Sequence, residues 1–215
     1  MKVIPAKYEI LTSINGEEAL KSIERAARTC YKSENLITKD SAERIVRRLI
    51  ESGHEAMLEH YSFSVKFTVD RGVSHELVRH RVASFAQEST RYCNYSQGKF
   101  GQEITVIKPC FWDEESIGYG FWHDACAQAE LYYFTLLKRG ATPQEARSVL
   151  PNSLKTDIVM TADLREWRHF FKLRAAGVTG APQPQMVEVA LPLLHEVQQL
   201  IPVVFDDIKP NCENT

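Results

Sequence analysis

The sequence predicts an α+β fold in which helices pack around a small, mainly antiparallel sheet. Most of the chain carries apolar residues at helical spacing, whereas residues 61–69 alternate apolar and polar side chains, as a half-buried antiparallel strand does. The chain has 215 residues, of which 44% are hydrophobic and 25% charged, and this suffices for one compact core. We therefore expect a single domain over residues 1–215.

Three main elements are expected before residue 70. The first is a helix at 18–31, whose apolar face holds Leu20, Ile23, Ala26, Ala27 and Cys30. Asp40 and Glu43 predict a capping box for a second helix that ends at Gly53. The inward side of this second helix holds Ile45, Val46, Leu49 and Ile50. The third element is the strand at 61–69, whose apolar face holds Phe63, Val65, Phe67 and Val69.

Helices dominate the rest of the chain. The expected elements are a helix from Ser74 to about Ala86, a strand at 104–107, a long helix at 120–138 ended by Gly140, a helix from Pro143 through Leu150, a strand at 156–161, a helix after Asp163 ended by Gly177 and a last helix at 184–200. Thr142, Pro143 and Glu145 combine an N-cap, a proline at the first helical position and a capping carboxylate. Asp163 and Glu166 predict a similar helix start.

Composition excludes several classes of protein. A net charge of −2 argues against a dedicated nucleic-acid binder, and no apolar run approaches the length of a membrane span. The first ten residues lack the pattern of a signal peptide, and five scattered cysteines without a CxxC motif favour a reducing cytoplasm. Neither His75 with His80 nor His54 with His60 has the spacing of zinc ligands, so we expect no metal.

One basic segment suggests chemistry. Between residues 71 and 91, Arg71, Arg79, Arg81 and Arg91 stand against Glu76 and Glu88. Arginine suits bidentate contact with phosphate, and Ser89, Thr90 and Arg91 in a loop would suit a phosphomonoester. On the expected helix, Arg79 and Arg81 would point to roughly opposite sides, so one is structural or the two serve different ligands or subunits. The alternative interpretation is a solvated helix face with ordinary ion pairs.

Four motifs carry a resemblance to a known family. Arg79-His80-Arg81, followed by seven residues and Ser89, resembles the signature of the flavin-dependent thymidylate synthases. Residues 53–60 resemble the family's GHE…EH stretch, and residues 145–151 resemble its ARxxLP segment. Residues 164–174 resemble its late helix that ends in LR.

The resemblance covers about residues 20–200, and it implies an enzyme that converts dUMP to dTMP with methylenetetrahydrofolate, NADPH and FAD. It also implies a homotetramer whose active sites combine several subunits. The implied dUMP-binding residues are Glu76, Arg79, Gln87, Glu88, Ser89, Thr90, Arg91, Arg147 and Arg174. The implied FAD-binding residues are His54, Glu59, Arg79, His80, Arg81, Val82, Gln87, Asp163, Arg165, His169 and Leu173. Arg174 is the implied catalytic residue, because a guanidinium at the uracil stabilises negative charge as it develops.

Three places depart from the family pattern and leave alternatives open. Asp163 stands where asparagine is common, residues 175–186 are Gly-rich without the usual histidine, and Ala56 and Ala86 replace polar residues. A paralogue that keeps the dUMP pocket but makes a 5-hydroxymethyl product is therefore a second hypothesis. A third is a non-enzymatic nucleotide- or RNA-binding module, which the acidic net charge disfavours.

Overall fold

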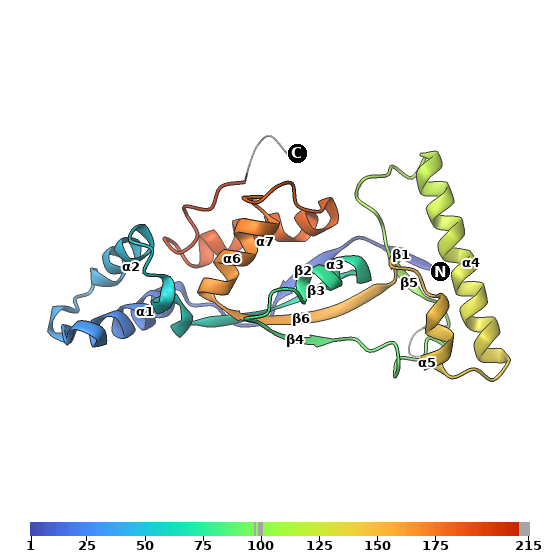
Figure 1. Cartoon of the computed structure of the whole chain (residues 1–215), viewed down its shortest axis with the longest axis horizontal. Helices are drawn as coiled ribbons and strands as arrows, with labels where there is room; N and C mark the ends of the chain where they lie inside the picture. The colour runs from blue at the N-terminus through green and yellow to red at the C-terminus, as the bar shows by residue number, and fades with distance from the viewer. Residues whose placement is uncertain (97, 99–100, 211–215) are drawn as a thin grey trace. The chain divides into compact units, whose positions relative to one another are not determined.

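The computed structural model describes residues 1–96, 98 and 101–210, and Figure 1 labels its elements. In chain order they are β1 (Lys2–Ile4), β2 (Lys7–Ile10), α1 (Gly16–Tyr31), η1 (Glu34–Leu36), α2 (Ser41–Glu51), η2 (Glu55–His60), β3 (Ser62–Asp70), α3 (Arg71–Leu77), β4 (Ser84–Gln87), β5 (Thr105–Ile107), α4 (Ile117–Lys138), α5 (Pro143–Ala146), η4 (Arg147–Val149), β6 (Lys155–Asp163), α6 (Leu164–Arg174) and α7 (Pro184–Leu200). The η elements are short 3-10 helices.

The strands form two sheets, and the predicted α+β class is confirmed. The larger sheet has four strands in the order β2-β3-β6-β4. The smaller sheet pairs β1 with β5 in parallel, with Lys2 opposite Thr105 and Ile4 opposite Ile107. On β3, the predicted apolar face is buried, because Phe63, Val65, Phe67 and Val69 are at most 1% exposed.

The chain folds into two compact units. The first contains residues 1–7, 67–79 and 85–159, and the second contains residues 8–66, 80–84 and the chain from residue 160 onward. Strands β3 and β6 each belong partly to one unit and partly to the other. A single domain over residues 1–215 stays a prediction.

In the first unit, the long helix α4 lies against the α5–η4 segment and closes a separate core. The buried residues of this core are Tyr95, Ile104, Val106, Cys126, Tyr133, Ala146 and Leu154. The predicted capping box is confirmed, since Thr142 accepts a hydrogen bond from the Glu145 backbone while the Glu145 side chain accepts one from Thr142 N–H. The expected helix is nevertheless divided: the α-helical part, α5, ends at Ala146, and the 3-10 helix η4 follows it to Val149.

In the second unit, helix α6 contributes most of the aromatic core. Trp167 stacks on Phe63 with ring centroids 4.7 Å apart, and its indole N–H donates to the Phe63 carbonyl. Phe171 contacts Phe205 edge-on at 5.5 Å. At the start of α1, Gly16 lies so close to the Leu200 carbonyl that a Cβ would overlap it, and only glycine fits there.

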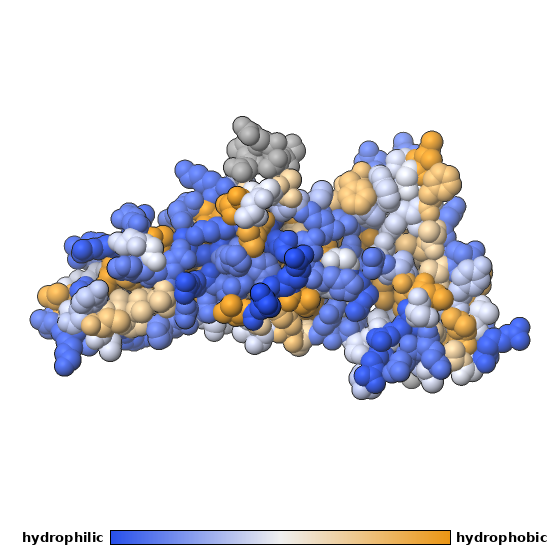
Figure 2. Space-filling model, viewed as in Figure 1, coloured by the Kyte–Doolittle hydropathy of each residue, from blue (hydrophilic) through white to orange (hydrophobic). Residues whose placement is uncertain are grey.

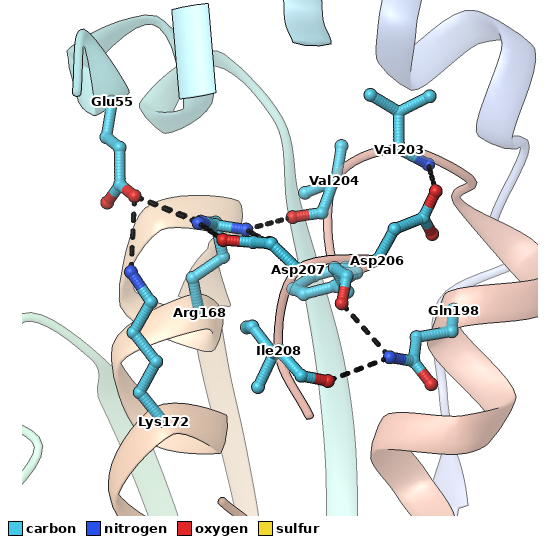
Figure 3. Close-up of polar contacts among 10 residues, drawn as sticks. Glu55, Arg168, Lys172, Gln198, Val203, Val204, Asp206, Asp207 and Ile208 are labelled. Atoms are coloured by element: carbon cyan, nitrogen blue, oxygen red, sulfur yellow. Dashed lines mark hydrogen bonds and ion pairs between the residues drawn. The ribbon is translucent and has the colours of Figure 1, made fainter. Parts of the chain in front are cut away.

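A buried arginine fixes the C-terminal segment to α6, as Figure 3 shows. Arg168 is 1% exposed. Its guanidinium makes a two-pronged contact with Asp207 at 2.6 and 2.7 Å, and it donates to the Val204 carbonyl. Glu55 accepts from Arg168 at 3.1 Å and from Lys172 at 3.3 Å. Because the buried charge is paired and hydrogen-bonded, it holds η2, α6 and the last described residues together.

The helix expected from Ser74 to Ala86 is wrong. Helix α3 begins three residues earlier, since the Asp70 side chain caps it by accepting from Val73 N–H at 2.7 Å. It ends at Leu77, and residues 84–87 form strand β4 instead. Pairing within the sheet outweighs the weak helical propensity of this segment. Arg79 and Arg81 therefore lie in a turn and do not occupy opposite faces of a helix, as the expected helix would have required.

Smaller expectations also need correction. Asp40 makes no capping hydrogen bond at the start of α2; the Ser41 hydroxyl bonds the Thr38 backbone instead. Glu43 pairs with Arg47 one turn along the same helix. Cys30, expected on the apolar face of α1, is exposed, whereas Glu24 is buried on that helix.

Candidate functional site

The predicted phosphate loop follows β4 in the first unit, and a charged network holds its start. The Glu88 N–H donates to the Asp157 carbonyl at 2.9 Å. The Glu88 carboxylate accepts from Lys155 Nζ at 2.9 Å and from the Tyr95 hydroxyl at 3.1 Å. Lys155 also contacts Asp157 at 2.5 Å. Strand β6 thereby fixes the position from which the loop departs.

Within this loop, two predicted arginines approach neighbouring groups. Thr90 is buried, and its hydroxyl accepts a hydrogen bond from Arg147 at 3.2 Å. Arg91 Nε donates to the Gln144 side chain at 2.9 Å, and Arg91 N–H donates to the Ser89 hydroxyl at 3.3 Å. The loop therefore lies beside the α5–η4 segment, and residues distant in sequence present two guanidiniums in one region of this unit.

The other predicted dUMP residues of the first unit lie on α3, in the turn after it and on β4. The Gln87 amide donates to the Ser74 hydroxyl at 2.9 Å and to the Thr156 hydroxyl at 3.2 Å. Glu76 is partly buried on α3, and the Arg79 N–H donates to the Glu76 carbonyl. Eight of the nine predicted dUMP residues thus belong to the first unit, whereas the ninth, Arg174, belongs to the second.

Neighbouring carboxylates keep the Lys155 ammonium charged. Burial lowers the pKa of Lys155, but hydrogen bonds to Asp157 and Glu88 outweigh it and leave the pKa raised. Burial and the nearby Glu88 carboxylate also raise the pKa of Tyr95, so this hydroxyl stays a proton donor. At neutral pH the Lys155 ammonium and the Tyr95 hydroxyl therefore both remain hydrogen-bond donors.

In the second unit, two predicted site residues, His80 and Arg174, form a chain of hydrogen bonds with Glu166. His80 Nδ1 lies 2.9 Å from the Glu166 carboxylate, and Arg174 Nε donates to His80 Nε2 at 3.2 Å. His80 is 3% exposed and Glu166 is 7% exposed. Burial raises the pKa of Glu166; His169 opposes this shift and Asp163 adds to it.

A pocket of about 490 Å³ opens beside this contact, within the second unit. It is lined by Glu55, Glu59, Val82, Asp163, Arg165, Glu166, His169 and Lys172. Five of these are predicted FAD residues, namely Glu59, Val82, Asp163, Arg165 and His169. Asp163 is confirmed as the N-cap of α6, since it accepts from Glu166 N–H at 2.9 Å.

The lining of this pocket is mostly charged, and its flavin contacts stay a prediction. Val82 is 71% exposed and offers an apolar surface, and His169 lies at the rim as an exposed ring. Arg165 and Lys172 supply positive charge. Each carboxylate already has an internal donor, as in the 2.6 Å contact of Glu59 with Arg165. The pocket therefore combines an exposed apolar side chain with two cations that are each paired with a carboxylate.

Other predicted FAD residues lie elsewhere. His54 lines a different pocket of about 400 Å³, together with Arg28 and Arg48. Arg81 is exposed in the turn before β4, and Leu173 is half-buried on α6. Gln87 and Arg79 belong to the first unit.

Among the described residues, one cluster offers metal-ligand atoms, and it is neither the His75/His80 nor the His54/His60 pair. Side-chain atoms of His80, Glu166 and His169 lie within 4.8 Å of one another. Both ring nitrogens of His80 are engaged, one by Glu166 and the other by Arg174, and the neighbouring guanidinium would repel a cation.

Sequence reasoning missed Lys155, Asp157 and the second role of Glu166. Lys155 and Asp157 are two residues apart on a strand, so their side chains point to the same face. This spacing could have indicated a charged pair on that face. Glu166 was interpreted only as part of a helix cap. Its contact with His80 joins positions 86 residues apart, and local patterns cannot reveal it.

Known proteins of one family resemble this chain over most of its length. A family model described as "Thymidylate synthase complementing protein" matches residues 11–203. The chain is 33% identical over 183 residues to the flavin-dependent thymidylate synthase of Pyrococcus abyssi, covering 82% of this chain and 72% of the relative. It is 33% identical over 194 residues to that of Geobacter sulfurreducens, covering 87% of this chain and 81% of the relative.

A solved structure shares the fold. The crystal structure of the UMP/dUMP methylase PolB from Streptomyces cacaoi, bound with 5-Br dUMP, matches with a TM-score of 0.79 and 23% identity, and the match covers 96% of each chain.

The fold and these matches define a flavin-dependent methyltransferase. The chain belongs to the thymidylate synthase complementing protein family, the flavin-dependent thymidylate synthases. The relatives are named flavin-dependent thymidylate synthases, which assigns thymidylate synthesis with a flavin cofactor to the family. No helix among the described residues is long and apolar enough to cross a membrane.

Proposed function

We propose that this chain carries out the reductive methylation of dUMP to dTMP with the residues named above. The observation that carries the assignment is the contact between Arg147 and Thr90, because it joins the RHR…S segment to the ARxxLP segment. Ser89, Thr90 and Arg91 would hold the phosphate of dUMP. Hydroxyls, backbone N–H groups and guanidiniums together suit a phosphate dianion.

The pocket in the second unit supports the cofactor side of the proposal. Arg165 would pair with the cofactor's pyrophosphate, and Val82 would cover the apolar ring. Arg174 would lie at the uracil carbonyl and stabilise the charge that develops there. When bound, FAD supplies the hydride chemistry after reduction by NADPH.

We further propose a homotetramer whose active sites combine subunits. Helix α4 exposes Ile117, Phe121, Leu131 and Tyr132, which are between 55% and 80% exposed. At 100° per residue, the four positions fall within an arc of about 100° around the helix axis, so they share one broad face. Figure 2 shows apolar residues along this helix. A second copy of the chain would cover this face, and Arg79 and Glu76 would then reach a nucleotide held by a neighbour. The cytoplasm is the proposed location.

The test is an assay of the purified, FAD-loaded protein with dUMP, NADPH and methylenetetrahydrofolate. We expect 5-methyl dUMP by mass spectrometry and a tetramer by light scattering. A 5-hydroxymethyl product would replace the proposal with the paralogue hypothesis. Because the neighbour in the solved structure is named a UMP/dUMP methylase, UMP is assayed in parallel, and a preference for UMP would change the substrate. Salt-dependent RNA binding without flavin would favour the non-enzymatic module.

A further inference from the structure

Glu166 contacts the proposed catalytic arginine through an intermediate histidine. Its carboxylate lies 2.9 Å from His80 Nδ1, and His80 Nε2 lies 3.2 Å from Arg174 Nε. Phe170 packs edge-on against the His80 ring at a centroid distance of 5.2 Å. The imidazole is therefore both buried and held in its plane by packing and by hydrogen bonds at two sides.

The chemistry of the two outer groups fixes the proton on the middle one. An arginine Nε–H can only donate, so His80 Nε2 must present its lone pair to Arg174. A neutral imidazole carries one proton, which then lies on Nδ1 and is donated to the Glu166 carboxylate. With no acceptor at Nδ1, the imidazole would favour a proton on Nε2. That N–H would oppose the N–H of Arg174, and the contact would be lost.

We propose that Glu166 is a positioning residue for thymidylate synthesis: it holds His80 as the Nδ1–H tautomer, and His80 thereby orients the Arg174 guanidinium. The proposal rests on the proposed role of Arg174 at the uracil. Low exposure of Glu166 and His80 strengthens both hydrogen bonds, since water competes little for them. A misplaced guanidinium loses much of its effect on the reacting state, which depends on geometry.

Two substitutions separate the hydrogen bond from packing. Glu166→Leu keeps the volume but removes the acceptor, and we expect kcat per bound flavin to fall by about 10–100-fold while the dUMP Kd stays within about two-fold. Glu166→Gln keeps an oxygen that can accept from Nδ1–H, and we expect it to recover most of kcat. Asp207→Asn is the matched control, because it weakens a different contact of α6 and should lower stability without lowering kcat.

A spectroscopic readout tests the tautomer without any assay. Long-range ¹⁵N–¹H spectra of protein labelled in its seven histidines, with His80 assigned from His80→Gln, should show Nδ1–H in the wild type. In Glu166→Leu the signal should change to the Nε2–H pattern. Spectra of wild type remain informative if Glu166→Leu does not fold.

Several outcomes would overturn the proposal. A wild-type His80 protonated at Nε2, unchanged kcat in Glu166→Leu, or a Glu166→Gln enzyme as slow as Glu166→Leu each contradicts it. A wild-type protein that shows the Nδ1–H signal but makes no dTMP would instead contradict the proposed function. The two failures are therefore distinguishable.

Discussion

Lys155 lies between two carboxylates, with its ammonium 2.9 Å from Glu88 and 2.5 Å from Asp157. Its side chain is 21% exposed and that of Glu88 is 14% exposed, so solvent screens this contact only partly. The relationship joins the first residues of β6 to the start of the predicted phosphate loop. It explains how a loop without regular structure can hold a defined position.

Lys155→Met should weaken dUMP binding. The substitution leaves the carboxylates of Glu88 and Asp157 facing each other, and their repulsion should displace the loop that follows. We expect the dUMP Kd to rise by about ten-fold, measured by flavin absorbance titration. Lys108→Met removes a more exposed ion pair of the same unit and should change Kd by less than about two-fold. Equal, small effects would show that the network does not position the loop.

Arg91→Ala should act on affinity. If Arg91 holds the phosphate, its loss should cost about 1.5–3 kcal/mol of dUMP binding, which is roughly 10–150-fold in Kd. Calorimetric titration of dUMP into the flavin-loaded protein measures this. Arg139→Ala removes an exposed arginine at the end of α4 and is the control. An unchanged Kd in Arg91→Ala would place the phosphate elsewhere.

Arg174→Ala should act on turnover. Loss of one charge-stabilising donor should lower kcat by about 10²–10³-fold, with tetramer and flavin retained. Single-turnover experiments with pre-reduced flavin separate this from dUMP binding. Arg174→Lys keeps a positive charge but lacks the Nε–H that contacts His80, so we expect little recovery. Full recovery by lysine would show that charge alone matters.

Asp207 should make the second unit sensitive to acid. Burial raises the pKa of Asp207, but the Arg168 guanidinium outweighs it and leaves the pKa below its ordinary value. A carboxyl with a lowered folded-state pKa contributes stability above its unfolded pKa near 4, and that stability is lost as the pH falls through the folded pKa.

Urea unfolding between pH 6 and pH 3 tests this. The free energy of unfolding of the wild type should fall below about pH 4. That of Asp207→Asn should be lower at pH 6 and should change less between pH 6 and pH 3. Asp206→Asn is the matched control, because it alters a neighbouring carboxylate that accepts from Val203 N–H instead of from Arg168. Parallel profiles for all three proteins would contradict the assignment to Asp207.

The sequence predicts many of the residues that meet in the candidate site, but it does not predict which of them contact one another. The family resemblance implies nucleotide-binding roles for Thr90 and Arg147, and the structure brings their side chains to 3.2 Å. It also implies roles for His80 and Arg174, which share a hydrogen bond. The expected dUMP and FAD roles of these residues stay predictions until ligands are measured.

Local sequence determined the helices with strong periodicity and clear caps, such as α7 and the starts of α5 and α6, because side chains three and four residues apart decide them. Tertiary structure alone decided that residues 84–87 pair as a strand, since a partner strand must supply the hydrogen bonds. It also decided that Glu166 meets His80 and that Asp207 meets Arg168. Those contacts join distant positions, and their strength comes from burial, which exists only once the chain has folded.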